Sequence, residues 1–99
     1  MQSSYPDSFN RDMGCTEAQW LGWLPAALGA NKWQRDGSCV QVSIDGGRLV
    51  LSWQEAAPRV IALMQVPRLL VNFRFTILDE AARYAFMKRF DLYMQRGGG

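Results

Sequence analysis

The sequence predicts an α+β fold in which two helices cover one face of a four-stranded antiparallel sheet. Apolar residues recur every three or four positions near both ends of the chain, as in amphipathic helices. Between these segments apolar and polar residues alternate, as in half-buried strands. Each element has one apolar side to bury. We therefore expect a two-layer sandwich in the order helix, four-stranded meander, helix, with both helices on one sheet face.

Length and composition indicate a single globular domain. The chain has 99 residues, 48% of them hydrophobic and 20% charged, which is typical of folded domains. We expect the domain to span residues 15–96, with flexible tails at 1–14 and 97–99. Neither a secretory signal nor a long apolar run is visible, so we expect a cytoplasmic protein without membrane contact. Cys15 and Cys39 are then expected to be free thiols.

The first helix is predicted from its end signals. Thr16 and Gln19 have the spacing of a capping box, and Gly29 is a natural C-terminal stop. Pro25 removes one backbone hydrogen bond, so we expect a kink or a break there. The apolar stripe consists of Trp20, Trp23, Leu24, Ala27 and Leu28.

A β-hairpin follows a connector at residues 30–37, in which Trp33 is expected to fold back onto the core. Residues 38–44 alternate, and Asp45-Gly46-Gly47 supplies the residues of a tight turn before a second alternating run. The expected pairs are Ile44 with Leu49, Val42 with Leu51 and Val40 with Trp53. This register places the apolar side chains of both strands on one face.

Residues 59–66 are ambiguous, because a short apolar run fits a buried strand or a short helix. We favour a strand after Pro58, followed by a turn at Pro67-Arg68 and a last strand at 69–77. A helix at 59–66 would give the alternative order αββαβα.

The second helix is predicted to begin after Asp79, whose carboxylate can cap it, with Glu80 near its positive end. Its apolar face consists of Ala82, Phe86, Met87, Phe90, Tyr93 and Met94.

Catalytic chemistry has little support in the sequence. The chain has no histidine, which removes the commonest general base and metal ligand, and two distant cysteines cannot form a zinc site alone. We expect no metal and no cofactor, and an enzyme is disfavoured. One alternative remains at Cys15, because the start of a helix can lower a thiol pKa and make the sulfur reactive.

The outer face of the predicted sheet is the candidate binding surface. By parity it carries four arginines and no acid around an aliphatic centre of Val50, Ile61, Leu63 and Leu70. An apolar patch with a polar rim is typical of a contact surface. The candidate binding residues are Arg48, Arg59, Ile61, Leu63, Arg68, Leu70, Asn72 and Arg74. Ser52, Gln54, Gln65 and Thr76 are expected on the same face.

Function is not determined by the sequence, and three hypotheses remain. The first is a non-enzymatic interaction module, either an adaptor or a homodimer, that uses this face for a protein partner. The second is binding of nucleic acid or another anion on the same face. A net charge of +2 and the inward placement of Trp53, Phe73 and Phe75 disfavour nucleic acid. The third is thiol chemistry at Cys15.

Overall fold

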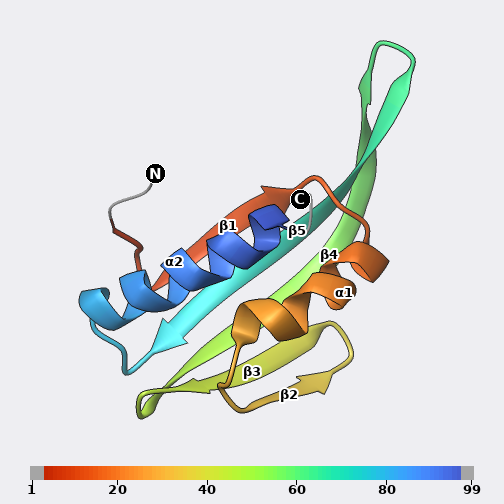
Figure 1. Ribbon diagram of the computed structural model, residues 1–99. Coiled ribbons are helices and arrows are strands. Elements are labelled where there is room, and N and C mark those ends of the chain that lie inside the picture. The colour runs from red at the N-terminus through yellow and green to blue at the C-terminus, as the bar shows by residue number, and fades with distance from the viewer. Residues whose placement is uncertain (1–3, 97–99) are drawn as a thin grey trace.

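The computed structural model describes residues 4–96 and has two helices and a five-stranded antiparallel sheet (Figure 1). The elements in chain order are β1 (Ser8–Met13), α1 (Glu17–Leu28), β2 (Trp33–Asp36), β3 (Cys39–Ile44), β4 (Gly47–Ile61), β5 (Met64–Thr76) and α2 (Glu80–Arg96). The predicted α+β class is confirmed, and a four-stranded meander lies between the helices, as expected. The fifth strand and several strand bounds differ from the prediction.

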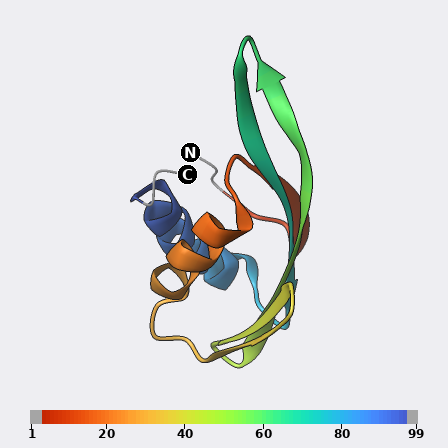
Figure 2. The same cartoon turned by 90° about the vertical axis from the view of Figure 1, so that its right-hand side faces the viewer.

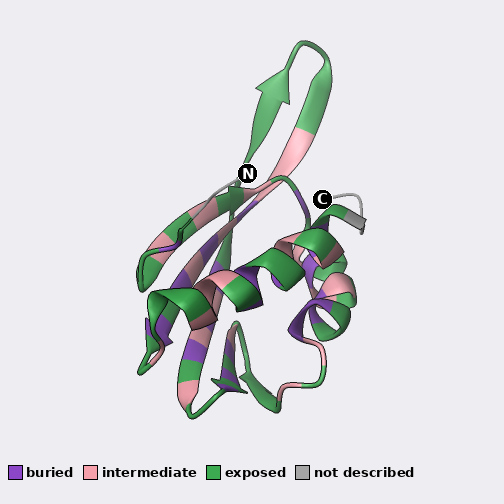
Figure 3. Ribbon diagram, turned by 60° about the vertical axis from the view of Figure 1, so that its left-hand side comes forward, coloured by how far each residue is buried: buried purple, intermediate pink, exposed green. Residues whose placement is uncertain are grey.

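The sheet has the strand order β1-β5-β4-β3-β2, so β1 and β2 are its edges. Both helices lie on the same side, and the other face is left open (Figure 2). The buried residues come from the covered face and from the helix sides turned toward it (Figure 3). This is the predicted two-layer arrangement.

Strand β1 corrects the expected flexible tail at 1–14. It pairs antiparallel with β5, from Ser8 opposite Arg74 to Met13 opposite Leu69. Before it, the Tyr5 side chain is only 4% exposed. The alternation in β1 is hard to recognise in sequence, because Arg11 occupies one of the inward positions. Residues 1–3 and the expected tail at 97–99 lie outside the described residues.

Strand β2 replaces the expected connector at residues 30–37. Its four residues pair with β3, from Trp33 opposite Val42 to Asp36 opposite Cys39. Trp33 does not fold back into the core, since it is 37% exposed at the edge of the sheet.

The β3–β4 hairpin is present, but its register differs from the prediction by two residues. Asp45 and Gly46 form the two-residue loop, with φ angles of 45° and 81°, as a primed hairpin turn requires. The observed pairs are Ile44 with Gly47, Val42 with Leu49 and Val40 with Leu51. A shift of two residues leaves every side chain on its predicted face.

Residues 59–66 are mostly extended, as in the favoured strand prediction, and form no helix. The predicted position of the following turn was wrong. Strand β4 continues through Pro58 to Ile61, and β5 starts at Met64 and continues through Pro67. The hairpin therefore turns at Ala62 and Leu63 instead of at Pro67-Arg68. Register slips by one residue between Ala56 and Arg59, which indicates a β-bulge beside both prolines. Prolines are tolerated there because the ladder is already interrupted.

The helices follow their predicted ends. Thr16 and Gln19 form the capping box, and Gly29 ends α1. Pro25 does not break the helix, which runs unbroken from Glu17 to Leu28. At the start of α2, the Ala82 N–H donates to the Asp79 carboxylate at 2.8 Å. The buried residues of α2 are Phe86, Met87, Phe90 and Met94.

A polar cluster ties β1 to α2 at the rim of the core. Arg11 donates from both terminal nitrogens to the Asp91 carboxylate, and the Tyr5 hydroxyl donates to the same group at 2.8 Å. The Arg11 guanidinium also lies 5.4 Å from the Phe73 ring centroid. Burial and the hydrogen bond to Asp91 raise the pKa of Tyr5 above its ordinary value. This cluster joins segments that are 80 or more residues apart in sequence.

The Asp91→Ala change should lower the free energy of unfolding by about 1–3 kcal/mol, because Arg11 and Tyr5 lose a charge-assisted acceptor. Urea denaturation followed by far-UV circular dichroism measures the loss. Asp36→Ala is the control, since Asp36 is exposed on edge strand β2. Equal stability of the two variants would contradict this role for Asp91.

Candidate functional site

Most of the predicted binding residues lie on the open face of the sheet. Cross-strand partners share a face, and the observed pairs are Arg48 with Thr76, Val50 with Arg74, Ser52 with Asn72, Gln54 with Leu70 and Ala56 with Arg68. β1 adds Ser8, Asn10 and Asp12 to this face, opposite Arg74, Asn72 and Leu70. The Asn72 amide donates to the Asn10 side chain at 2.8 Å.

Two of the four arginines already share one carboxylate as a partner. Arg68 donates to Asp12 at 2.7 Å, and Arg59 donates to the same carboxylate at 3.2 Å. The expectation of a face without acids was wrong, because Asp12 belongs to the segment that was expected to be a tail. The hydrogen bond from Arg68 and the nearby positive charges hold the pKa of Asp12 below its ordinary value. This leaves Arg48 and Arg74 as the uncompensated arginines of the set.

The expected aliphatic centre is not one patch. Val50 and Leu70 lie in the body of the open face, whereas Ile61 and Leu63 lie at the far end of the β4–β5 hairpin. At about 3.3 Å per residue, Val50 and Ile61 are roughly 35 Å apart along β4. Gln65 lies opposite Val60 instead of on the face of Arg59, because the turn at Ala62 and Leu63 places it on β5.

The end of the β4–β5 hairpin projects beyond the rest of the sheet as an arm, defined here as residues 57–67 (Figures 1 and 2). β3 pairs with β4 only as far as Ser52, and β1 pairs with β5 only from Leu69 onward. The arm is therefore a two-stranded ribbon with no third strand beside it. An isolated two-stranded hairpin is marginally stable in water.

The apolar tip, residues 60–64, is the most exposed hydrophobic segment of the described chain. Its sequence is Val-Ile-Ala-Leu-Met, without a polar side chain. Leu63 is 102% exposed, and Val60, Ile61 and Met64 are 67%, 54% and 67% exposed. The whole arm end is exposed in Figure 3. Ala62 adopts a φ of 54°, an unfavourable angle for a residue with a side chain.

The edges of the arm are poor templates for strand addition. Pro58 interrupts one edge and Pro67 the other, and neither residue has an N–H to donate. Arg59 and Arg68 add charged side chains near the same level. Contacts of the arm with another molecule therefore depend on the apolar side chains of the tip more than on free backbone groups.

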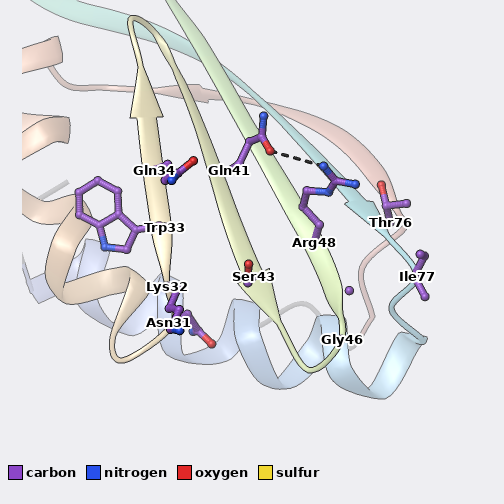
Figure 4. A pocket seen from close by; sticks show the side chains of 11 residues that line it. Asn31, Lys32, Trp33, Gln34, Gln41, Ser43, Gly46, Arg48, Thr76 and Ile77 are labelled. Atoms are coloured by element: carbon purple, nitrogen blue, oxygen red, sulfur yellow. Dashed lines mark hydrogen bonds between the residues drawn. The ribbon is translucent and has the colours of Figure 1, made fainter.

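Two shallow hollows lie on the open face. The basic hollow, of about 780 Å³, is lined by Asn31, Lys32, Trp33, Gln34, Gln41, Ser43, Gly46, Gly47, Arg48, Thr76 and Ile77 (Figure 4). The central hollow, of about 550 Å³, is lined by Asn10, Arg11, Asp12, Ser52, Trp53, Gln54, Leu70, Val71 and Asn72. In Figure 4 the Trp33 ring points away from Arg48, and polar side chains occupy the space between β2 and β5.

The surroundings of Cys15 do not favour a reactive thiol. It is buried, with 1% exposure, and burial raises its pKa instead of lowering it as the helix start was expected to do. Cys39 lies half-buried on β3, and neither cysteine forms a disulfide. Within residues 4–96 no three His, Cys, Asp or Glu side chains gather as they would to hold a metal ion.

The large aromatic residues of the central strands point into the core. Trp53, Phe73 and Phe75 are each at most 5% exposed. The open face of β4 and β5 thus offers no aromatic ring on which a base can stack.

Comparison with protein-family models, curated proteins and solved structures finds no match to this chain. In the described part of the chain, neither helix is long and apolar enough to cross a membrane. The projecting arm was missed by sequence reasoning, although the uninterrupted apolar run at 60–64 was its available signal.

Acid should release the arm from β1. The pKa of Asp12 is lower in the folded protein than its ordinary value of 3.8. The stabilisation that its ionised carboxylate gives the arm is therefore fully present above pH 3.8 and is lost as the pH falls through the lower folded pKa. When the pH is lowered from about 6 to about 2.5, ¹⁵N relaxation of the amides of residues 57 and 59–65 should report increased motion.

The control for this acid effect is Asp12→Asn, which should show the increased arm motion already at neutral pH. Circular dichroism at both pH values checks that the body stays folded. An arm equally rigid in both proteins and at both pH values would contradict an anchoring role for Asp12.

The two thiols should differ in reactivity. In the folded protein Cys39 should react with dithionitrobenzoate roughly tenfold or more faster than Cys15, because the Cys15 thiol is shielded and stays protonated. Single variants Cys15→Ser and Cys39→Ser assign each phase. Fast reaction of the Cys39→Ser protein would restore the reactive-thiol hypothesis.

Proposed function

We propose that this protein is a non-enzymatic interaction module whose arm inserts its apolar tip into an apolar groove of a different protein. The observation that carries this proposal is the full exposure of Leu63 amid Val60, Ile61 and Met64 on a projecting ribbon. Exposed apolar groups gathered in one place are typical of contact sites. Of the candidate binding residues predicted on the outer face, Ile61 and Leu63 of the arm form the main contact. The rest of the open face lies beside this contact.

The extent of the tip favours a partner that surrounds the arm. A specific interface takes roughly 20–30 residues from each side, so contact between two tips alone would be too small. A groove that receives both faces of the arm, and then contacts the open face near its base, reaches that size. Binding energy is concentrated in well-packed, desolvated pockets near the centre of an interface, which is the place a deeply inserted tip would take.

A second copy of this chain is a less suitable host for the tip. The basic hollow is lined mainly by amide, hydroxyl and charged side chains. The central hollow exposes more apolar surface, but Asn10, Asp12 and Asn72 also line it. Placing the tip there would remove water from these polar groups without giving them new hydrogen bonds. A lipid surface is also disfavoured, because the arginines nearest the tip, Arg59 and Arg68, are already held by the Asp12 carboxylate.

The arm proposal is tested with a photo-crosslinking amino acid at position 63 in a native extract, compared with the same group at the exposed Leu92 of α2. A discrete adduct at 63 alone is identified by mass spectrometry, and that protein is purified. The purified pair should bind, and Leu63→Asp should weaken the affinity by about tenfold or more.

Three results would overturn this proposal. One is the absence of an adduct specific to position 63. A second is a light-scattering mass of two chains for the unchanged protein and of one chain for Leu63→Asp. This result would identify a homodimer instead. A third is sedimentation with phosphatidylcholine–phosphatidylglycerol vesicles that Leu63→Asp abolishes, which would identify a lipid surface.

A further inference from the structure

Two rows of side chains cross the open face at the end of the sheet farthest from the arm. The first row follows from three contacts: the Ser43 N–H donates to the Lys32 carbonyl at 2.9 Å, Ser43 lies opposite Arg48, and Arg48 lies opposite Thr76. The second row contains Gln34, Gln41, Val50, Arg74 and Ser8. The first row, with Gln34 and Gln41 of the second, lines the basic hollow. Val50, Arg74 and Ser8 continue the second row beside it.

These rows contain three cations, Lys32, Arg48 and Arg74, and no carboxylate. The nearest acids along the chain are Asp36, two residues after Gln34 on β2, Asp45, in the β3–β4 turn, and Asp7, before β1. None of the three lines the hollow. The remaining side chains, apart from Val50, are hydroxyls and amides, which donate hydrogen bonds without adding charge.

Arg48 and Arg74 differ from the other arginines whose side chains the structure describes. The others bind a carboxylate, a backbone carbonyl or both: Arg11, Arg35, Arg59, Arg68, Arg83 and Arg89. Arg48 has only a 3.4 Å contact to the Gln41 amide oxygen, drawn in Figure 4. For Arg74, no hydrogen bond or ion pair is found within residues 4–96.

The placement of these two arginines is unfavourable without a counter-charge. Arg48 lies opposite Thr76, two residues from Arg74, so the two are diagonal neighbours about 7–8 Å apart. Like charges at such positions repel. An oxyanion between them would remove the repulsion and accept from both guanidinium groups, whose planar forks match phosphate and carboxylate. The Ser43 and Thr76 hydroxyls and the Lys32 ammonium lie along the same row.

We propose that the basic hollow binds an oxyanion group, a phosphate or a carboxylate of a ligand, through Arg48 and Arg74 with Lys32 at the far side. The site goes beyond the proposed function of the arm, because it lies at the opposite end of the sheet and uses none of its residues. The Arg48 contact to Gln41 is long, so the guanidinium turns toward an anion at little cost.

The test is an NMR titration of the ¹⁵N-labelled protein with inorganic phosphate and, separately, with succinate, each compared with potassium chloride at equal ionic strength. Saturable shifts are expected at the amides of Ser43, Arg48 and Thr76. The double change Arg48→Gln with Arg74→Gln should raise the dissociation constant by about tenfold or more. Lys88→Gln, an exposed cation on α2, is the matched control and should leave it unchanged.

The two anions distinguish the source of the oxyanion. Shifts with phosphate alone support a phosphate-bearing ligand, and shifts with succinate support a carboxylate-bearing one. Shifts no larger than those in potassium chloride, or equal shifts in the double variant, would overturn the proposal. Leu63→Asp should titrate like the unchanged protein, so the failure of either proposal is seen separately from the other.

Discussion

The fold depends on a chain of aromatic contacts between the two layers. Phe73 on β5 stacks on Phe9 of β1 at 4.7 Å and meets the edge of Phe90 from α2 at 5.5 Å. Trp20 of α1 then contacts Phe90 at 6.0 Å and Trp53 of β4 at 5.6 Å. Offset and edge-to-face pairs of this kind add to the free energy of burial. The series joins both helices to three strands, so it determines which sheet face is covered.

Covering one face has two consequences for the surface. The other face stays open to solvent, and its composition is accordingly polar along β1, β3 and β5. The helices also end before the β4–β5 hairpin does, so the last residues of that hairpin have no layer to pack against (Figure 2). Burial of an apolar side chain is worth about 1.5–3 kcal/mol, and the tip residues Ile61, Leu63 and Met64 forgo most of it in the isolated chain.

Charge is distributed unevenly over the same surface. Asp12 binds Arg59 and Arg68 at the base of the arm, and Asp91 binds Arg11 at the rim of the core. Within residues 4–96, the cations at the opposite end of the open face have no carboxylate partner. The sheet therefore has an apolar end, where Arg59 and Arg68 are paired with Asp12, and a basic polar end. The arm and the basic hollow differ in both position and chemistry.

Local signals in the sequence were sufficient for the helices, the first hairpin and the side of the sheet that faces the core. The Thr16 capping box, the Gly29 stop and the turn at Asp45-Gly46 act within a few residues, and alternation survives a register shift of two. Three features depended on tertiary structure: the pairing of β1, the turn at Ala62-Leu63 and the ion pairs of Arg59 and Arg68 with Asp12. β1 is a strand because β5 offers it an edge, and the turn contains no glycine, proline or asparagine to reveal it. Asp12 meets its arginines across 47 and 56 residues of chain, a distance over which sequence patterns hold no information about contact.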